Sequence, residues 1–109
     1  MIYNSLDNLA KDIHTTAVEK GFWPDKVDDI FIAKQMMMIV SEVVEAMEAI
    51  RKNKGKQEVA DEMADIIIRT LDLYQGLVDN GYVDQELQVA LNNKTSFNKS
   101  RPERHGVKF

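Results

Sequence analysis

Apolar residues recur at intervals of three and four along four successive segments of this chain, and strand-like alternation appears nowhere over a useful length. Leu6, Leu9, Ile13 and Ala17 set this pattern in the first segment. Such spacing places apolar side chains on one face of a helix, which must then be buried against another helix. We therefore predict an all-α fold: a single domain over residues 1–109 that forms a four-helix bundle completed by homo-oligomerisation.

Start and stop signals give the expected bounds of the four helices. The first begins after Asn4 or Ser5 and is closed by Gly21, just before Phe22-Trp23-Pro24. The second is expected over residues 28–51 and the third over residues 57–78, with a Lys- and Gly-containing turn between them. The fourth is expected over residues 84–93, and the remainder is expected to be a tail.

Charge is distributed unevenly along the chain, whose net charge is −4. Residues 92–109 hold five basic and one acidic side chain, whereas residues 1–91 hold nine basic and seventeen acidic ones. The overall acidity argues against nucleic acid as a partner, because duplex binding depends on neutralising phosphates over a broad surface. The basic end is instead suited to face something anionic held at the acidic part.

Several classes of protein are disfavoured by what the sequence lacks. It has no cysteine, which excludes disulfides, thiol catalysis and Cys-ligated metal. No apolar run approaches the ~20 residues of a membrane span, so we expect no membrane partner. The N-terminal stretch lacks a basic region followed by an apolar one, so we expect no secretory signal. The expected location is the cytoplasm.

Carboxylates lie on apolar helices where a core is expected. Glu42 and Glu45 are ~60° apart on the second helix, roughly opposite its main apolar stripe, and Glu62 and Asp65 repeat this spacing on the third helix. If these faces meet, four carboxylates converge, and their repulsion requires a counter-ion. The main apolar stripe of the second helix is Ala33, Met36, Val40, Val43, Val44 and Met47, and the expected core stripe of the third is Ala60, Ala64, Ile67, Leu71, Tyr74 and Val78.

The ligand type indicates which cation would bind. Di-iron bundles use Glu-x-x-His, and neither carboxylate pair contains histidine, so an all-oxygen set favours Mg²⁺, with Mn²⁺ as a substitute. The alternative is a solvated acidic face with ion pairs such as Asp65–Arg69. A single E-x-x-E is common in helices, but two such pairs separated by sixteen residues on apolar helices are more specific.

The motifs Glu42-Val-Val-Glu45 and Glu62-Met-Ala-Asp65 resemble the paired motif of the MazG-like all-α nucleoside triphosphate pyrophosphohydrolases. The resemblance continues in order through residues 13–14, 20–23, 41–51, 61–73 and 94–109, which spans nearly the whole chain. It implies Mg²⁺-dependent hydrolysis of NTP or dNTP to the monophosphate and pyrophosphate, as nucleotide-pool house-cleaning, by a helical homodimer or homotetramer.

The resemblance also implies roles for individual residues. The Mg²⁺ ligands would be Glu42, Glu45, Glu62 and Asp65, with Glu42 and Glu45 as catalytic candidates and Glu45 favoured as the base. The substrate would be bound by Lys94, Asn98 and Arg101, and its base would be contacted or enclosed by His14 and Trp23. Two of these residues have ordinary alternatives: His14 as a partly buried helix residue, and Trp23 as a core or interface anchor.

A second function class remains open. Helices that are apolar on two sides in so short a chain favour a homo-oligomer, because four helices offer each other little cover. Such an oligomer could be non-catalytic, binding nucleotide or a protein partner, with its acids serving solubility.

Overall fold

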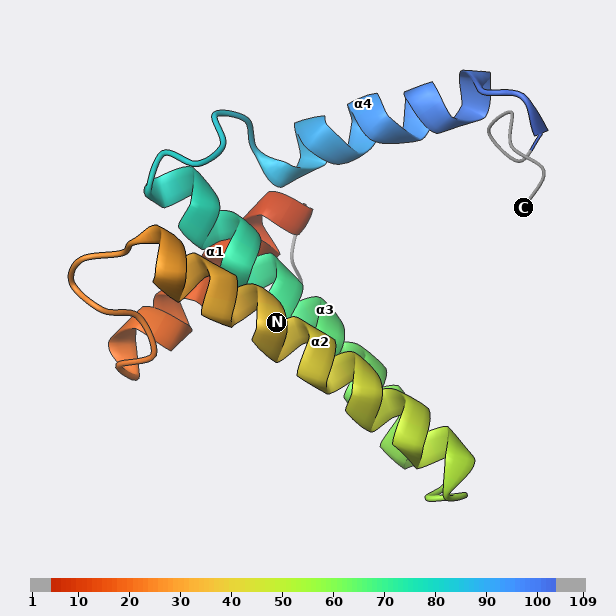
Figure 1. The fold of residues 1–109 in the computed structure, drawn as a ribbon. Helices are drawn as coiled ribbons and strands as arrows, with labels where there is room; N and C mark the ends of the chain where they lie inside the picture. The colour runs from red at the N-terminus through yellow and green to blue at the C-terminus, as the bar shows by residue number, and fades with distance from the viewer. Residues whose placement is uncertain (1–4, 104–109) are drawn as a thin grey trace.

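The computed structural model describes residues 5–103, and over this range the chain forms four helices and no strand (Figure 1). The helices are α1 (Leu6–Glu19), α2 (Asp29–Arg51), α3 (Lys56–Asp79) and α4 (Leu87–Ser100). The all-α prediction is therefore confirmed. Asn4, as an alternative helix cap, and the expected tail from residue 104 onward lie outside the described residues.

Local capping signals set the starts of α1 and α2, and the C-terminal ends of α1, α2 and α3, close to their predicted bounds. The Ser5 hydroxyl accepts from the Asn8 N–H at 3.2 Å, and the Asp28 carboxylate accepts from the Phe31 N–H at 2.8 Å. After α1, Gly21 adopts a φ of 83°, and the Phe22 N–H bonds back to the Ala17 carbonyl. This is a Schellman ending, and α2 and α3 end in the same way.

The fourth helix differs from its predicted bounds at both ends. It begins at Leu87 rather than Asp84, because the carboxylate of Asp7 in α1 accepts from the Gln88 N–H at 3.0 Å and so caps it from a distance. It continues past Asn93 to Ser100, since Pro102 is the next residue that interrupts a helix. A residue before proline is pushed to extended backbone, and Arg101 is extended, at φ −82° and ψ 150°.

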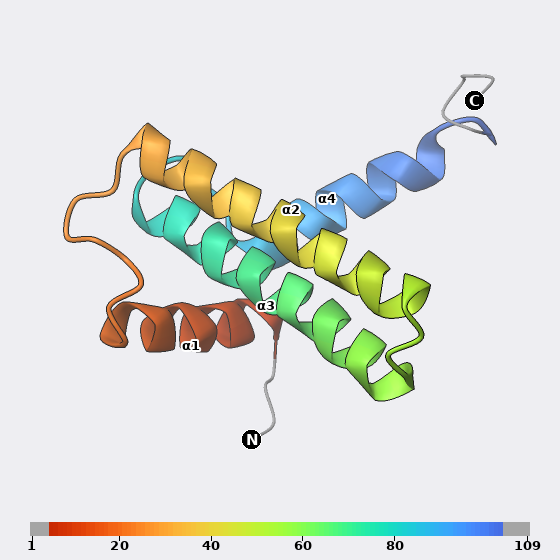
Figure 2. The same cartoon turned by 60° about the horizontal axis from the view of Figure 1, so that its bottom comes forward.

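The core lies where α1, the loop after it, α2 and α3 meet. α2 and α3 run antiparallel, side by side, and α1 packs on α3 (Figure 2). Trp23, Ile32 and Leu73 form the buried cluster. The ring of Trp23 lies directly against Gly76 of α3, where any Cβ atom would overlap it. The loop between α1 and α2 is thus anchored to α3 by one aromatic side chain.

The main apolar stripe of α2 does not pack within the chain. All six of its residues are exposed, and the face that lies against α3 includes Ile32, Glu42, Ala46 and Ala49. The expected core stripe of α3 is wrong over its first half. Leu71 is buried and Tyr74 and Val78 are half-buried, but Ala60, Ala64 and Ile67 are exposed. The two helices therefore meet through the faces that carry their carboxylates.

α4 leaves the molecule open in shape. It packs against α1 and projects away from the α2–α3 pair (Figure 1). The Cα radius of gyration is 16.2 Å, above the ~13 Å of a compact domain of this length. No helix in the described part of the chain is both long and apolar enough to cross a membrane.

Candidate metal centre

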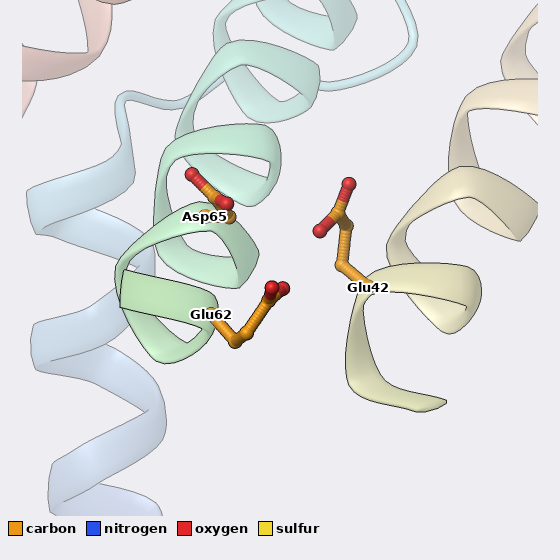
Figure 3. Close-up of side chains that lie close together, drawn as sticks. All are labelled: Glu42, Glu62 and Asp65. Atoms are coloured by element: carbon orange, nitrogen blue, oxygen red, sulfur yellow. The ribbon is translucent and has the colours of Figure 1, made fainter. Parts of the chain in front are cut away.

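Three carboxylates meet between α2 and α3. Glu42 of α2 and Glu62 of α3 extend toward each other, with Asp65 beside them on α3 (Figure 3). One oxygen atom from each of the three lies within 4.8 Å of the other two. The i, i+3 spacing on α3 puts Glu62 and Asp65 on one face, and the antiparallel packing brings Glu42 to that face.

Glu62 has a buried oxygen atom and lies among several other carboxylates. Its Oε2 atom is buried, and within residues 5–103 it has no hydrogen-bond partner. Burial raises the pKa of Glu62 above its ordinary value, and the negative charges of Glu45, Glu58, Glu42 and Asp65 raise this pKa further. A buried acceptor without a partner is costly, so this oxygen is suited to a cation.

Glu42 has a cationic partner that the sequence analysis did not assign to it. Arg69 Nε donates to Glu42 Oε1 at 2.8 Å, linking α3 to α2. The Glu42 side chain is only 13% exposed, which a solvated acidic face would not require. One guanidinium faces three carboxylates here, so a divalent cation would bring the cluster near neutrality.

Glu45 lies one turn beyond Glu42 on α2. Its side chain is exposed, and it is not part of the three-oxygen cluster. It is nevertheless close enough for its charge to make the largest contribution, after burial, to the raised pKa of Glu62. The structure thus brings together three of the four expected ligands and places the fourth next to them.

A cavity of about 510 Å³ borders the carboxylates. Glu42, Asp65 and Arg69 form part of its lining. The sequence analysis missed most of the other lining residues, although Lys34 and Gln35 stand out as rare polar residues in an apolar helix. Its apolar walls are Ala17, Phe22, Phe31, Met38 and Ile68, and its remaining polar lining is Lys34, Gln35 and Asp72.

His14 and Trp23 are buried and contact Asp72, which lines the cavity, but neither of the two lines the cavity itself. Trp23 Nε1 donates to Asp72 Oδ1 at 3.0 Å, and His14 Nδ1 lies 2.8 Å from the same oxygen. His14 Nε2 is 3.5 Å from a carboxylate oxygen of Asp79, and the His14 and Trp23 rings meet edge-on at 4.7 Å. The arrangement holds the loop after α1 to α3, and the expected base contacts stay predictions.

The expected substrate-binding residues of the basic end lie on α4 and just after it. Lys94 Nζ is 5.0 Å from the centre of the Phe97 ring, and the Arg101 guanidinium carbon is 5.3 Å from it. Lys94 and Arg101 therefore flank one aromatic side chain. Neither they nor Asn98 lines the cavity beside the carboxylates. Within one chain, the basic residues and the acidic cluster are not brought together.

Comparisons of the chain with protein-family models, with curated proteins and with solved structures each returned no match. No family is assigned to the chain on these comparisons, and its described part is an all-α fold with four helices.

Proposed function

We propose that this chain is a metal-dependent nucleoside triphosphate pyrophosphohydrolase, which cleaves NTP or dNTP into the monophosphate and pyrophosphate. One observation carries the proposal: Glu42, Glu62 and Asp65 converge from two helices at the edge of a large cavity. The sequence resemblance to the MazG-like enzymes gives the reaction, and nucleotide-pool house-cleaning is the corresponding role.

The donor atoms fit Mg²⁺, with Mn²⁺ as a substitute. All are carboxylate oxygens, the ligand type that these hard cations prefer, and the unpartnered Glu62 oxygen lacks the positive partner that a cation would supply. The residues that would hold the ion are Glu42, Glu62 and Asp65, with Glu45 next to them. A bound Mg²⁺ would lower the pKa of a water molecule and offset the charge of the phosphates.

The chain's own residues would position the substrate and move one proton. We assign Glu45 the role of base, because it stands beside the three-oxygen cluster without belonging to it. It accepts a proton from water as the water oxygen bonds to the α-phosphorus. The bond between the α-phosphorus and the bridging oxygen breaks, and its electron pair leaves with pyrophosphate. The nucleoside would occupy the cavity, between the aromatic walls of Phe22 and Phe31.

A homodimer or homotetramer would complete this site. Lys94, Asn98 and Arg101 do not line the cavity of their own chain, so we propose that they face the triphosphate held by a second copy. A triphosphate carries about four negative charges, of which one Mg²⁺ offsets two, so further cations are needed around it. The exposed apolar stripe of α2 offers a surface through which copies could associate.

The exposed stripe also supports a second candidate, a non-catalytic helical oligomer that serves as a nucleotide-binding or protein-interaction module. Thermal unfolding separates a protein-interaction module from a metal enzyme, whereas a nucleotide-binding module is separated from the enzyme by its lack of pyrophosphate release. If the carboxylates hold a metal for nucleotide binding, Mg²⁺ raises the melting temperature and nucleotide raises it further. An interaction module without a metal site shows neither shift.

The test of the proposed activity is a panel of NTPs and dNTPs with Mg²⁺, in a preparation free of pyrophosphatase, with pyrophosphate and orthophosphate measured separately. We expect pyrophosphate from the parent chain. Asp65→Asn should lose this activity, whereas Asp61→Asn should keep it. Asp61 is one turn away on the same helix, exposed and bonded to Gln57, so it is a matched control. Orthophosphate without pyrophosphate would sink the proposal.

A further inference from the structure

Arg69 occupies the boundary between the carboxylates and the cavity. It follows Asp65 by one helical turn, yet its Nε binds Glu42 across the α2–α3 interface at 2.8 Å. Its guanidinium therefore sits on a residue of the candidate metal centre, at the position of a counter-cation. Glu42 cannot give full charge to a metal ion and to Arg69 at once, so the two cations compete.

The surroundings of Arg69 leave it room to move. Its side chain is 39% exposed, three times the exposed fraction of its partner Glu42. It lines the cavity of about 510 Å³, and it also lines a second cavity of about 300 Å³ that α1 residues border on the other side. Arg69 thus borders the space where the proposed substrate would lie.

We propose that Arg69 is an exchangeable cation: it holds the Glu42 carboxylate while the centre is metal-free, and it turns to the phosphate oxygens of the substrate once a divalent cation is bound. This inference rests on the proposed function. Arginine suits the second role because its planar fork donates two parallel hydrogen bonds to phosphate. This exchange implies an order of binding, in which the metal ion binds first and the triphosphate second.

An ordinary inter-helix salt bridge is the competing explanation, and the two differ in the sign of one effect. If Arg69 only joins α2 to α3, removing it loosens Glu42 and weakens metal binding. If Arg69 competes with the metal, removing it strengthens metal binding and weakens phosphate binding. Arg51 provides the matched control. It forms a salt bridge with Glu48 at 3.0 Å, but both residues lie on α2 and the pair is on the exposed surface.

The experiment titrates Mn²⁺ into the parent chain, Arg69→Gln, Arg69→Lys and Arg51→Gln, and then titrates inorganic tripolyphosphate into each Mn²⁺-loaded protein. For Arg69→Gln we expect Mn²⁺ to bind at least about threefold more tightly and tripolyphosphate at least about tenfold more weakly. Arg69→Lys keeps the charge but loses the fork, so Mn²⁺ affinity should stay near that of the parent while tripolyphosphate affinity falls. Arg51→Gln should change neither affinity.

Each other result is decisive. Weaker or unchanged Mn²⁺ binding by Arg69→Gln overturns the inference. If Arg69→Gln does not fold, unchanged tripolyphosphate binding by Arg69→Lys overturns it instead. Should the parent bind Mn²⁺ and release pyrophosphate while the Arg69 variants behave like it, the inference fails alone. A parent chain that binds no Mn²⁺ removes both the inference and the proposed function.

Discussion

Glu62 is held in a position that disfavours its own ionisation. Its pKa is raised by burial and by neighbouring carboxylates, so between the ordinary pKa and this raised value the folded chain binds more protons than the unfolded chain. Stability therefore falls as the pH rises through that window, and the loss is complete above the raised pKa. A bound cation would remove this penalty at neutral pH.

We accordingly predict that Glu62→Gln raises the melting temperature of the metal-free protein at neutral pH and abolishes its further rise with Mg²⁺. The amide keeps the shape of the side chain without the charge that the neighbouring carboxylates repel. Thermal unfolding from about pH 4 to pH 8, with and without Mg²⁺, measures both effects.

Asp61→Asn, next to Glu62 but exposed, is the control and should keep the parent's response to Mg²⁺. A lower melting temperature for metal-free Glu62→Gln would mark Glu62 as a structural acid instead. Glu42 is less suited to this test, because a glutamine there would leave Arg69 without its carboxylate partner.

His14 and Trp23 illustrate what the sequence could not decide at the level of single residues. An amphipathic helix followed by a glycine is consistent with a role in base binding for both residues. It is equally consistent with His14 as a partly buried helix residue and Trp23 as a core or interface anchor. The structure shows them bonded to Asp72, which is 58 residues from His14 and 49 from Trp23. Spacing along a helix reports on neighbours within a turn or two, so it could not reveal a partner at that distance.

Helix ends were predictable where the cap is local and not where it is distant. Ser5 and Asp28 cap their own helices three residues on, and α1 and α2 accordingly begin within a residue of their predicted starts. α4 receives its cap from Asp7, 81 residues away, and its predicted start was wrong by three residues. The same distinction holds for the carboxylates. The sequence predicted that residues three apart share a helix face, but not that Arg69 of α3 would bind Glu42 of α2.

The extension of α4 places Lys94, Asn98 and Arg101 on one continuous element and its C-cap. We predict that Arg101→Ala lowers kcat/KM at least tenfold, about 1.4 kcal/mol of transition-state stabilisation, because a cation facing the phosphates is lost. Steady-state pyrophosphate release at low salt measures it. Lys108→Ala, whose site lies outside the described residues, should change little. Parent-like turnover by Arg101→Ala would show that α4 does not clamp the phosphates.

A single copy of the chain leaves much of its apolar surface exposed, above all on α2. The sequence showed that α2 is apolar on nearly all sides, but not which side would pack within the chain. In the structure, the carboxylate-bearing face of α2 packs against α3. The side chains left about half exposed are Met36, Val40, Val43, Val44 and Met47. Seven apolar residues are buried, and no large side chain among the described residues is fully enclosed. A domain of this size with so little core gains stability by association.

If copies associate through that stripe, a charge placed on it should separate them. Val44 is 47% exposed in the single chain, so Val44→Glu costs little if the protein is a monomer but buries an unpaired carboxylate if α2 lies in an interface. We predict that the parent elutes as a dimer or tetramer and Val44→Glu as a smaller species, by size exclusion with light scattering. Val18→Glu is the matched control: Val18 is 46% exposed, but it lies on α1, outside the stripe, so this variant should keep the parent's mass.

If the proposed α4 contacts cross between copies, the Val44→Glu species should also lose pyrophosphate release while still binding Mn²⁺, since Glu42, Glu62 and Asp65 all belong to one chain. A parent protein that is monomeric and fully active would show that the site is not shared between copies. The residues of α4 would then act, if at all, on substrate bound to their own chain.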